Sequence, residues 1–543
     1  MTSNGTLRTN HPDQTKELFE SPSLQFPVFN CRASIPAGAM ALLTILACTT
    51  IAGCSHRGVS GESSTVNFLI ESMPTNLDPR IGTDAQSEHL DGLIFSSLLA
   101  HDALMNIVPD IAERWDASDP LTYRFHLRQG VRFHDGRVLT SADVKFTFDS
   151  ILSGTIQTPK RGAFRMVTSV EAPDDATVVF HLREPYASFL WNLTRPGVGI
   201  VPRNSGTEMS RHPIGTGPFR FVSMKTDEEI ILERNLAYFG APPSIERVRF
   251  RIVPDAIVRA LELRKGTADV AINALSPDMV VTLAKEPGII ADQQPGTPLA
   301  YVAFNCDDRI LAHHEARQAL AYATDRPTLI RYLYRSQARP ASSLLPPNHW
   351  AYDSNVKQYG YDVRKAEQLL DAAGFKRAAN GVRFHLTLKT STEESTRLLG
   401  EALADEWKRV GVVLELRPLE FATFYADITR GSFQLYTYRW VGGNSDPDIF
   451  EYVFSSKKMP PDGANRGHYK NPVVDALLDQ ARVEMNQQKR KAILSEIQSL
   501  VAEDEPYINL WYLDNVCVHR ARLTGIVIPP GGDYEFLDLA RLE

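Results

Sequence analysis

Near its C-terminal end the chain contains the segment RWVGGNSDPDIF, whose residue types could bind a small molecule. Trp440 offers a flat apolar face for stacking or for contact with a cation. Gly442 and Gly443 would let the backbone approach a ligand closely, and Asn444 and Asp446 add polar groups. Each feature also has a structural interpretation, because a tryptophan can belong to the core and glycines can serve a turn. We treat these five residues as candidate ligand-binding positions.

Asp446 has two competing interpretations. Its carboxylate could pair with a positively charged group of a solute. It also precedes Pro447 and an apolar helical segment, so it could cap that helix, with the proline in the first turn. Capping preferences favour the second interpretation.

Motifs typical of enzymes are largely absent from the sequence. The run from His313 to Glu315 begins like the zinc motif HExxH, but position 318 is glutamine, so the second ligand is missing. There is no GxSxG elbow, no GxxxxGK[ST] phosphate loop and no dinucleotide fingerprint. The glycine-rich segment PIGTGPFRF lacks a following helix start, so a turn between lobes is the preferred interpretation. The sequence therefore predicts no catalytic residue, no metal site and no cofactor.

The composition is that of an ordinary globular protein with more than one domain. A length of 543 residues exceeds a single ordinary core, and about 150 residues per domain gives two or three domains. The net charge is only -7, and no dense stripe of lysine and arginine occurs. Nucleic acid is therefore not expected as a partner.

A charge-free segment from Ala33 to Cys54 could direct the chain to the cell envelope. By length alone it could span a membrane, but its proline, glycines and small final residues are typical of a secretory signal. Its end, TIAGC, is similar to a bacterial lipobox, in which the cysteine is acylated and becomes the first residue of the mature protein. Cys54 is thus the predicted lipid anchor. A plain signal peptide or a signal anchor with a chance cysteine is the alternative.

The polar residues 1–30 are more than a normal signal region needs. A misassigned start explains them, since translation from near Val28 would leave a short basic segment. After Cys54 only Cys306 and Cys517 remain, without ligand-like spacing. Both lie in apolar strand-like runs, where a buried free thiol is the commoner state, although the two could pair in an oxidising compartment.

Alternating strand and helix patterns indicate an α/β protein. The clearest unit has a strand at 248–252, a helix capped by Asp255 and ended by Gly266, and a second strand at 270–272. This pattern predicts a βαβ unit with a parallel sheet. Residues 123–138 alternate around a glycine and a turn, which predicts a hairpin before a helix.

Six segments, taken in order, resemble the extracellular solute-binding proteins of family five, which serve ABC importers of dipeptides, oligopeptides and nickel complexes. They are GVRFHDGRVLTSADVKFTF, PIGTGPFRF, ERNLAYFGAPPSIERVRFRIV, EARQALAYATDRPTLI, YDVRKAEQLLDAAGF and RWVGGNSDPDIF. The resemblance spans nearly all of the mature chain. It implies an α/β, two-lobed, periplasmic-binding-protein-like fold of type II with an extra subdomain in the first lobe. A ligand would bind between the lobes, which a hinge lets open and close.

The resemblance also implies domain boundaries, with PLAYVAFN and PYINLWYL as the strands that cross between lobes. The expected parts are a signal region at 1–53, a lipidated tether at 54–61, lobe one at 62–98, 205–297 and 506–543, its subdomain at 99–204, and lobe two at 298–505.

In dipeptide and oligopeptide binders, the loop equivalent to WVGGNSDP carries an aspartate that pairs with the α-ammonium group of the ligand. Counting back from Asp446, this position is Gly443, so the carboxylate is missing. A buried ammonium without a carboxylate is costly. Either another acidic residue pairs with it, or the ligand is not a free-amine dipeptide.

These observations predict a lipid-anchored receptor rather than an enzyme. It would capture a peptide-like or other small polar solute and deliver it to ABC permease subunits and their ATPases. Its expected location is periplasmic or extracytoplasmic, held at a membrane through Cys54. A surface lipoprotein or sensor with a transport-derived fold is the alternative, followed by a hydrolase that uses cleft carboxylates. The choice among a peptide, a metal chelate and a sugar stays open.

Overall fold

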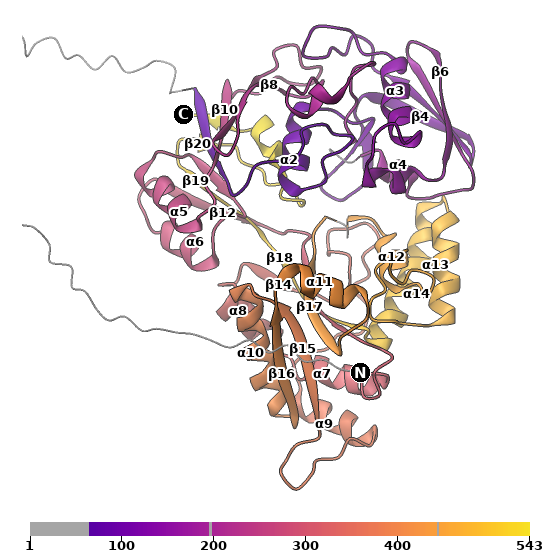
Figure 1. Ribbon diagram of the computed structural model, residues 1–543, viewed down its shortest axis with the longest axis vertical. Coiled ribbons are helices and arrows are strands. Elements are labelled where there is room, and N and C mark those ends of the chain that lie inside the picture. Colours follow the sequence, from indigo (N-terminus) through magenta and orange to yellow (C-terminus); the bar gives the residue numbers. More distant parts are fainter. Residues whose placement is uncertain (1–63, 195–197, 443–444) are drawn as a thin grey trace, which may run out of the picture. The chain divides into compact units, whose positions relative to one another are not determined.

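The computed structural model describes residues 64–194, 198–442 and 445–543, whose α/β elements are shown in Figure 1. The predicted anchor Cys54 lies outside these residues, as do Gly443 and Asn444. Three larger sheets organise the described part, and each has its own hydrophobic core. We call the body around the seven-stranded sheet lobe one, that around the six-stranded sheet lobe two, and that around the four-stranded sheet the subdomain.

Lobe one is built on a mixed sheet in the order β12-β19-β11-β1-β10-β9-β8. Its strands are β12 (Ile289–Gln294), β19 (Asn515–Arg520), β11 (Val270–Ile272), β1 (Thr65–Ile70), β10 (Arg247–Ile252), β9 (Glu229–Arg234) and β8 (Phe219–Lys225). Its helical segments are α2 (Ala85–Ile94), η4 (Thr207–Ser210), α5 (Ala256–Lys265), α6 (Pro277–Leu283) and η6 (Tyr534–Asp538). A two-stranded sheet of β20 (Leu523–Thr524) and β21 (Arg541–Leu542) adjoins the C-terminus.

The predicted βαβ unit is confirmed in this lobe. Strand β1 lies between β10 and β11 and is parallel to both, so helix α5 connects two strands of one parallel set. The Asp255 side chain accepts a 2.9 Å hydrogen bond from the backbone N–H of Val258. Gly266 ends the helix with φ of 77°, a conformation that glycine adopts without a steric penalty.

The subdomain has a four-stranded antiparallel sheet in the order β4-β5-β7-β6. Its elements are β4 (Ala112–Asp119), β5 (Thr122–Leu127), α3 (Ser141–Leu152), η2 (Pro159–Phe164), β6 (Val167–Asp174), β7 (Thr177–Leu182) and α4 (Phe189–Asn192), preceded by the pair β2 (Leu99–His101) and β3 (Ile107–Pro109). The helix expected after residues 123–138 is α3, and the expected hairpin is reduced to a short antiparallel turn at 131–139 that does not include β5. Strand β5 pairs with β4 and β7, because its apolar alternation fits the middle of a sheet, and 132–138 forms only an isolated bridge.

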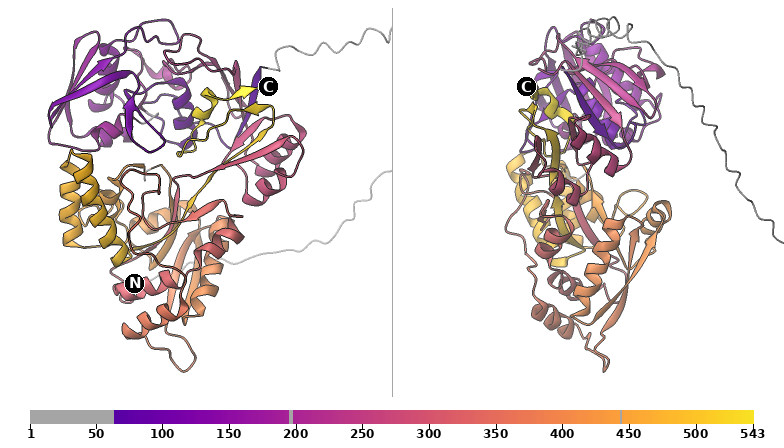
Figure 2. Two further views of the ribbon diagram at one scale, coloured as in Figure 1. Left: turned by 180° about the vertical axis from the view of Figure 1, so that it is seen from behind. Right: turned by 90° about the vertical axis from the view of Figure 1, so that its left-hand side faces the viewer.

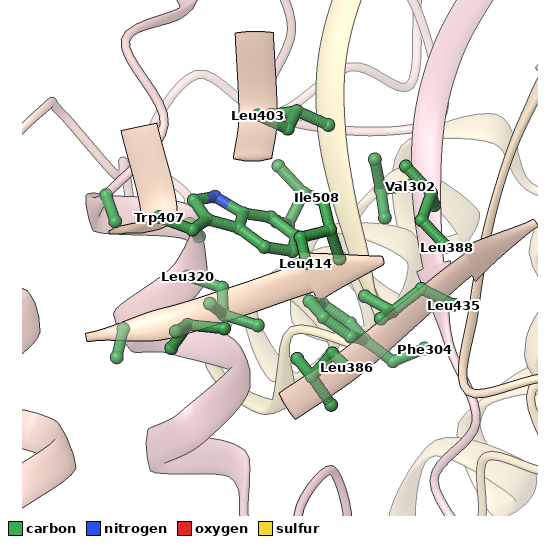
Figure 3. Close-up of a cluster of buried hydrophobic side chains, with 14 of the residues drawn as sticks. Val302, Phe304, Leu320, Leu386, Leu388, Leu403, Trp407, Leu414, Leu435 and Ile508 are labelled. Atoms are coloured by element: carbon green, nitrogen blue, oxygen red, sulfur yellow. The ribbon is translucent and has the colours of Figure 1, made fainter. Parts of the chain in front are cut away.

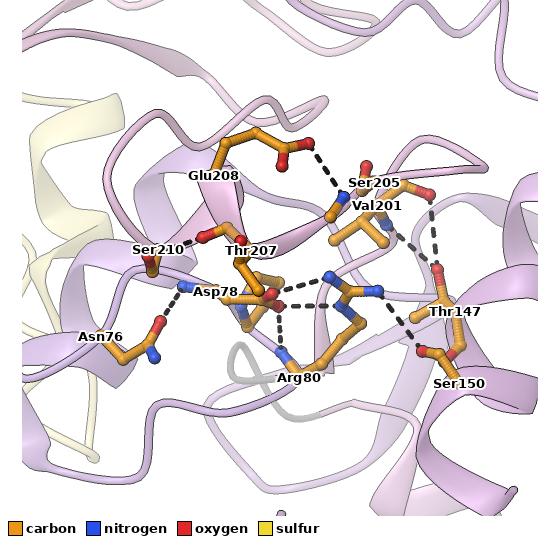
Figure 4. Close-up of polar contacts among 12 residues, drawn as sticks. Asn76, Asp78, Arg80, Thr147, Ser150, Val201, Ser205, Thr207, Glu208 and Ser210 are labelled. Atoms are coloured by element: carbon orange, nitrogen blue, oxygen red, sulfur yellow. Dashed lines mark hydrogen bonds and ion pairs between the residues drawn. The ribbon is translucent and has the colours of Figure 1, made fainter. Parts of the chain in front are cut away.

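A buried ion pair stands where lobe one meets the subdomain (Figure 4). Arg80 donates from Nε and Nη2 to the two carboxylate oxygens of Asp78, at 2.9 and 2.7 Å. Its Nη1 contacts the hydroxyl of Ser150 on α3 at 3.4 Å. Because both charges are almost fully buried, their mutual pairing is what makes the burial tolerable.

Lobe two is built on a sheet in the order β14-β18-β13-β17-β15-β16. Its strands are β14 (Ala338–Pro340), β18 (Tyr507–Leu513), β13 (Leu299–Phe304), β17 (Leu435–Trp440), β15 (Phe384–Ser391) and β16 (Val412–Leu419). Its helices are α7 (His314–Tyr322), α8 (Arg326–Leu333), α9 (Val363–Ala372), α10 (Glu394–Lys408), α11 (Phe421–Thr429), α12 (Ile449–Phe454), α13 (Pro472–Val483) and α14 (Gln487–Asp504).

The core of lobe two centres on Trp407, which packs among aliphatic side chains from the sheet and from α7 and α10 (Figure 3). The indole is fully buried, and its Nε1 donates a 3.0 Å hydrogen bond to the hydroxyl of Thr324. This bond removes the cost of burying a polar N–H group. The core therefore fixes α10 on the sheet.

Two pairs of consecutive strands connect the lobes, as Figure 1 and Figure 2 show. Strands β12 and β19 pair antiparallel in the first sheet, and β13 and β18 pair antiparallel in the second. The backbone N–H of Leu513 donates a 2.8 Å hydrogen bond to the carbonyl of Pro298, so the connecting segments lie side by side. Cys517 lies in β19 and Cys306 just after β13, and both thiols are free.

Candidate functional site

A cavity of about 520 Å³ lies between lobe two and the part of the chain formed by lobe one and the subdomain. This volume lies in the range of ordinary small-molecule sites. The first wall consists of Thr83, Glu88, Pro159, Lys160, Ala163, Phe164, Tyr186, Asn192 and Val198. Lobe two contributes Trp440, Asp446, Asp448, Ile449 and Tyr452. Apolar and aromatic side chains with a few charged groups suit a small organic solute.

Trp440 ends strand β17 and is half-buried at the cavity wall. Its ring stacks against Tyr301 with a centroid distance of 6.0 Å and meets Tyr452 edge-on at 6.3 Å. It therefore lines the cavity and also packs against the core of lobe two. Its packing against the core is observed, whereas its contact with a ligand stays a prediction.

Asp446 is buried in the same wall, with 6% of its surface exposed. Its Oδ1 accepts hydrogen bonds from the Ser188 hydroxyl and from the backbone N–H of Asp448, each 2.8 Å long. Burial and the nearby Asp448 carboxylate raise the pKa of Asp446 to about 6. The capping interpretation is borne out in part: Asp446 accepts the N–H groups of Asp448 and Ile449 and so caps the turn that leads into α12, although α12 itself begins at Ile449 with Asp448 as its N-cap residue.

A polar network joins the subdomain to lobe two at this wall. Arg490 of α14 donates from Nη2 to the Ser188 hydroxyl at 3.0 Å and to the Asp448 carboxylate at 2.7 Å. Nearby, Arg482 forms a 2.6 Å ion pair with Glu184 of the subdomain. We call the group Ser188, Asp446, Asp448 and Arg490 the bridging network. It ties the two walls of the cavity together.

Gly442 is exposed and has φ of 71°, a conformation that disfavours other residue types. It is not part of the cavity wall, so in this structure it serves the turn after β17. The structure thus brings together Trp440 and Asp446 among the candidate positions. Gly443 and Asn444 lie outside the described residues.

Sequence reasoning missed Tyr186, Ser188, Tyr452 and Arg490. Ser188 and Arg490 carried no signal, because they contact each other across 302 residues of sequence, and Ser188 contacts Asp446 across 258. Tyr452 had a local signal. It stands on the short helix α12 with 46% of its surface exposed, among buried apolar neighbours. An exposed aromatic next to the candidate loop could have marked it as a wall residue.

Within 64–194, 198–442 and 445–543, no group of three or more His, Cys, Asp or Glu side chains could hold a metal ion. Among the helices that the structure describes, none is both long enough and apolar enough to cross a membrane.

Two lobes joined by paired strands, with a cavity between their walls, define a binding protein of the two-lobed type II class. The chain belongs to the family described as bacterial extracellular solute-binding proteins, family 5, whose middle-region model matches residues 106–460. The predicted family and fold class are thereby confirmed. The domain boundaries stay predictions.

Several relatives and solved structures are similar over most of their length. The dipeptide-binding protein of Escherichia coli is 26% identical over 88% of this chain and 94% of its own. Heme-binding protein A of Haemophilus influenzae is 29% identical over 79% and 83%. The structure of the substrate-binding protein CtaP of Listeria monocytogenes has a TM-score of 0.80 at 27% identity, covering 88% of this chain and 99% of its own. The peptide complex of DppA from Helicobacter pylori has a TM-score of 0.72 at 27% identity, covering 88% and 98%.

Proposed function

We propose that the protein is the lipid-anchored receptor of an ABC importer, which captures a small solute between its lobes and presents it to the permease. The observation that carries this proposal is the cavity, whose walls come from different lobes and are joined by the bridging network. Solute that enters such a site is surrounded on both sides and shielded from water. The similar protein from Helicobacter pylori is described as an ABC transporter-associated periplasmic binding protein.

Within the proposed site, the loop from Trp440 to Asp446 borders the solute. Trp440 supplies apolar contact, and Gly442, Gly443 and Asn444 belong to the same loop. The relatives bind solutes as different as a dipeptide and heme, according to their names. The missing carboxylate at position 443 argues against a copy of the dipeptide site. A peptide-like or other small solute without a free α-ammonium group fits this chain better.

Mass spectrometry of the purified protein, before and after denaturation, tests the proposal. A receptor should release a small molecule of defined mass on unfolding, and adding that molecule back should raise the unfolding temperature. Protein that releases nothing from native preparations, and that turns over a substrate instead, would support the hydrolase alternative.

The anchor is tested separately, by labelling cells with a fatty-acid analogue. We expect wild-type protein to take up label and to sediment with membranes, and Cys54→Ala protein to do neither. Cys517→Ala is the matched control, because its thiol is buried in β19. Label on the Cys54→Ala variant would make another residue the anchor.

A further inference from the structure

Two groups of aromatic side chains lie on lobe two, one at the cavity and one on α11 and β17. Trp440 and Tyr452 line the cavity, and Phe421, Tyr425 and Tyr438 form the second group, with centroid distances of 6.1 Å for Phe421–Tyr425 and 6.4 Å for Phe421–Tyr438. We call these five residues the aromatic ladder. Phe421, Tyr425 and Tyr452 expose 51, 41 and 46% of their surfaces. Exposed aromatics gathered in this way mark a binding surface more often than a core.

Arg466 contacts one ring of each group of the aromatic ladder. Its guanidinium carbon is 5.4 Å from the centroid of Tyr425 and 5.8 Å from that of Trp440. Only 6% of the residue is exposed. This guanidinium does not itself line the cavity, but it contacts the ring of the wall residue Trp440.

The guanidinium of Arg466 is poorly satisfied. Its Nη2 contacts the Tyr425 hydroxyl at 3.3 Å, whereas its Nε and Nη1 have no hydrogen-bond partner among the described residues. No carboxylate within that part of the chain forms an ion pair with Arg466. The indole Nε1 of Trp440 is likewise buried without a described partner. Two neighbouring side chains thus hold N–H donors that lack an acceptor.

Such an arrangement is unfavourable unless an acceptor arrives. A buried cation keeps its charge only at the cost of lost hydration, and contact with aromatic faces offsets this cost in part. An anionic oxygen would satisfy the guanidinium and the indole together, with the charge-assisted bonds that arginine forms best. The carboxylates of Asp446 and Asp448 cannot serve, because Ser188 and Arg490 hold them in the bridging network.

We propose that the solute is an amphiphilic anion, with an apolar or aromatic body that lies on the aromatic ladder and a carboxylate or similar group that binds at Arg466 and Trp440. This inference rests on the proposed function, because it assigns the chemistry of the solute to the same cavity. It also accounts for position 443, since an anionic solute needs no carboxylate partner there.

Three probes of one shape test the inference: 2-naphthylacetate, 2-naphthylacetamide and 2-naphthylethylamine, which are anionic, neutral and cationic. Equilibrium dialysis against purified ligand-free protein measures their dissociation constants. We expect 2-naphthylacetate to bind about tenfold or more tightly than either of the others, as charge-assisted hydrogen bonds predict. In Arg466→Gln protein this preference should fall to about threefold or less, because the anion loses a charge-assisted hydrogen bond and the amide only a neutral acceptor's weaker one.

Two further variants make the result specific. Arg430→Gln removes an exposed arginine of lobe two that pairs with Asp427, and it should keep the preference for the anion. Trp440→Phe retains a ring but removes the indole N–H, and it should weaken the anion more than the amide. Since Arg466 is an uncompensated buried cation, Arg466→Gln should fold with an unfolding temperature equal to or above that of wild type.

Equal binding of the three probes, preference for the cation, or no binding of any probe would overturn the inference. One result would assign the site to an inorganic anion instead. In it the three probes bind alike, and chloride alone raises the unfolding temperature of wild type but not that of Arg466→Gln protein. These outcomes differ from failure of the proposed function. If the proposed function fails, the purified protein releases no solute at all. If it releases a neutral or cationic solute, only the charge that this inference assigns to the solute is contradicted.

Discussion

The hydroxyl of Ser188 in the subdomain donates a 2.8 Å hydrogen bond to the carboxylate of Asp446 in lobe two, across 258 residues of sequence. Both residues are almost fully buried where they meet. Asp446 also lines the cavity, so one side chain belongs to the solute site and to the contact between lobes. Solute binding and lobe contact are therefore expected to affect each other.

Arg490→Met should open the protein. The change removes the hydrogen bonds to Ser188 and Asp448 and leaves two carboxylates close together without their cation. We expect a larger radius of gyration by small-angle scattering and an affinity for the released solute lower by about tenfold. Lys489→Met, an exposed neighbour on α14, is the control and should scatter like wild type. An unchanged radius in Arg490→Met would show that other contacts hold the lobes together.

Asp446 should make stability depend on pH in an unusual direction. Its pKa is raised from the ordinary value of 3.8 to about 6, so the folded protein binds more protons than the unfolded chain between those values. The contribution of Asp446 to the free energy of unfolding then falls as pH rises through this window, by up to about 3 kcal/mol. Asp446→Asn should abolish that part of the slope in urea unfolding curves measured between pH 4 and 6.

The control for this measurement is Glu228→Gln, which changes a carboxylate that is 69% exposed between β8 and β9. It should leave the pH slope as in wild type. A slope that persists in Asp446→Asn would mean that other buried acids, such as Glu406, account for it.

Trp440→Ala should affect both binding and stability, because the ring is half-buried, lines the cavity and packs on Tyr301. We expect a loss of about 1 to 3 kcal/mol in affinity for the released solute. Stability should fall by about 1 to 2 kcal/mol, less than for a buried tryptophan. Calorimetric titration and unfolding curves measure the two effects. If this variant binds the released solute as tightly as wild type does, Trp440 acts only as a core residue.

Trp407→Ala should have the opposite profile. This indole is fully buried in the core of lobe two, and its N–H donates a hydrogen bond to the Thr324 hydroxyl. Trp407 is not among the residues that line the cavity. Truncation should cost about 3 to 5 kcal/mol of stability and leave the affinity of the folded protein unchanged. A large loss of affinity at a temperature where the variant is folded would contradict this separation.

Much of the fold could be predicted because its signals are local. The cap at Asp255 depends on a side chain that bonds to backbone three residues away, and the structure contains it. The position of β5 could not be read in the same way. The alternation of apolar and polar residues in β5 fits any antiparallel neighbour. Its pairing with β4 and β7 depends on the packing of the subdomain core.

The site shows the same division between local and distant signals. Trp440 could be proposed from its loop, whereas the partner of Asp446 could not, because Ser188 lies in an unremarkable stretch of the subdomain. Arg466 was invisible for a different reason. An arginine in a polar segment suggests a solvated surface, and only the structure shows it buried under two aromatic rings.

The segments between the lobes are very short. Four residues, 295–298, separate β12 from β13, and Asp514 alone separates β18 from β19. These segments contain few rotatable backbone torsions, and the N–H of Leu513 donates a hydrogen bond to the carbonyl of Pro298. The lobes therefore have little freedom to shift relative to each other. We expect the lobes to move mainly by rotation about these two connecting segments, so that little entropy is lost when they come together. Solute binding energy can then go into affinity rather than into ordering the protein.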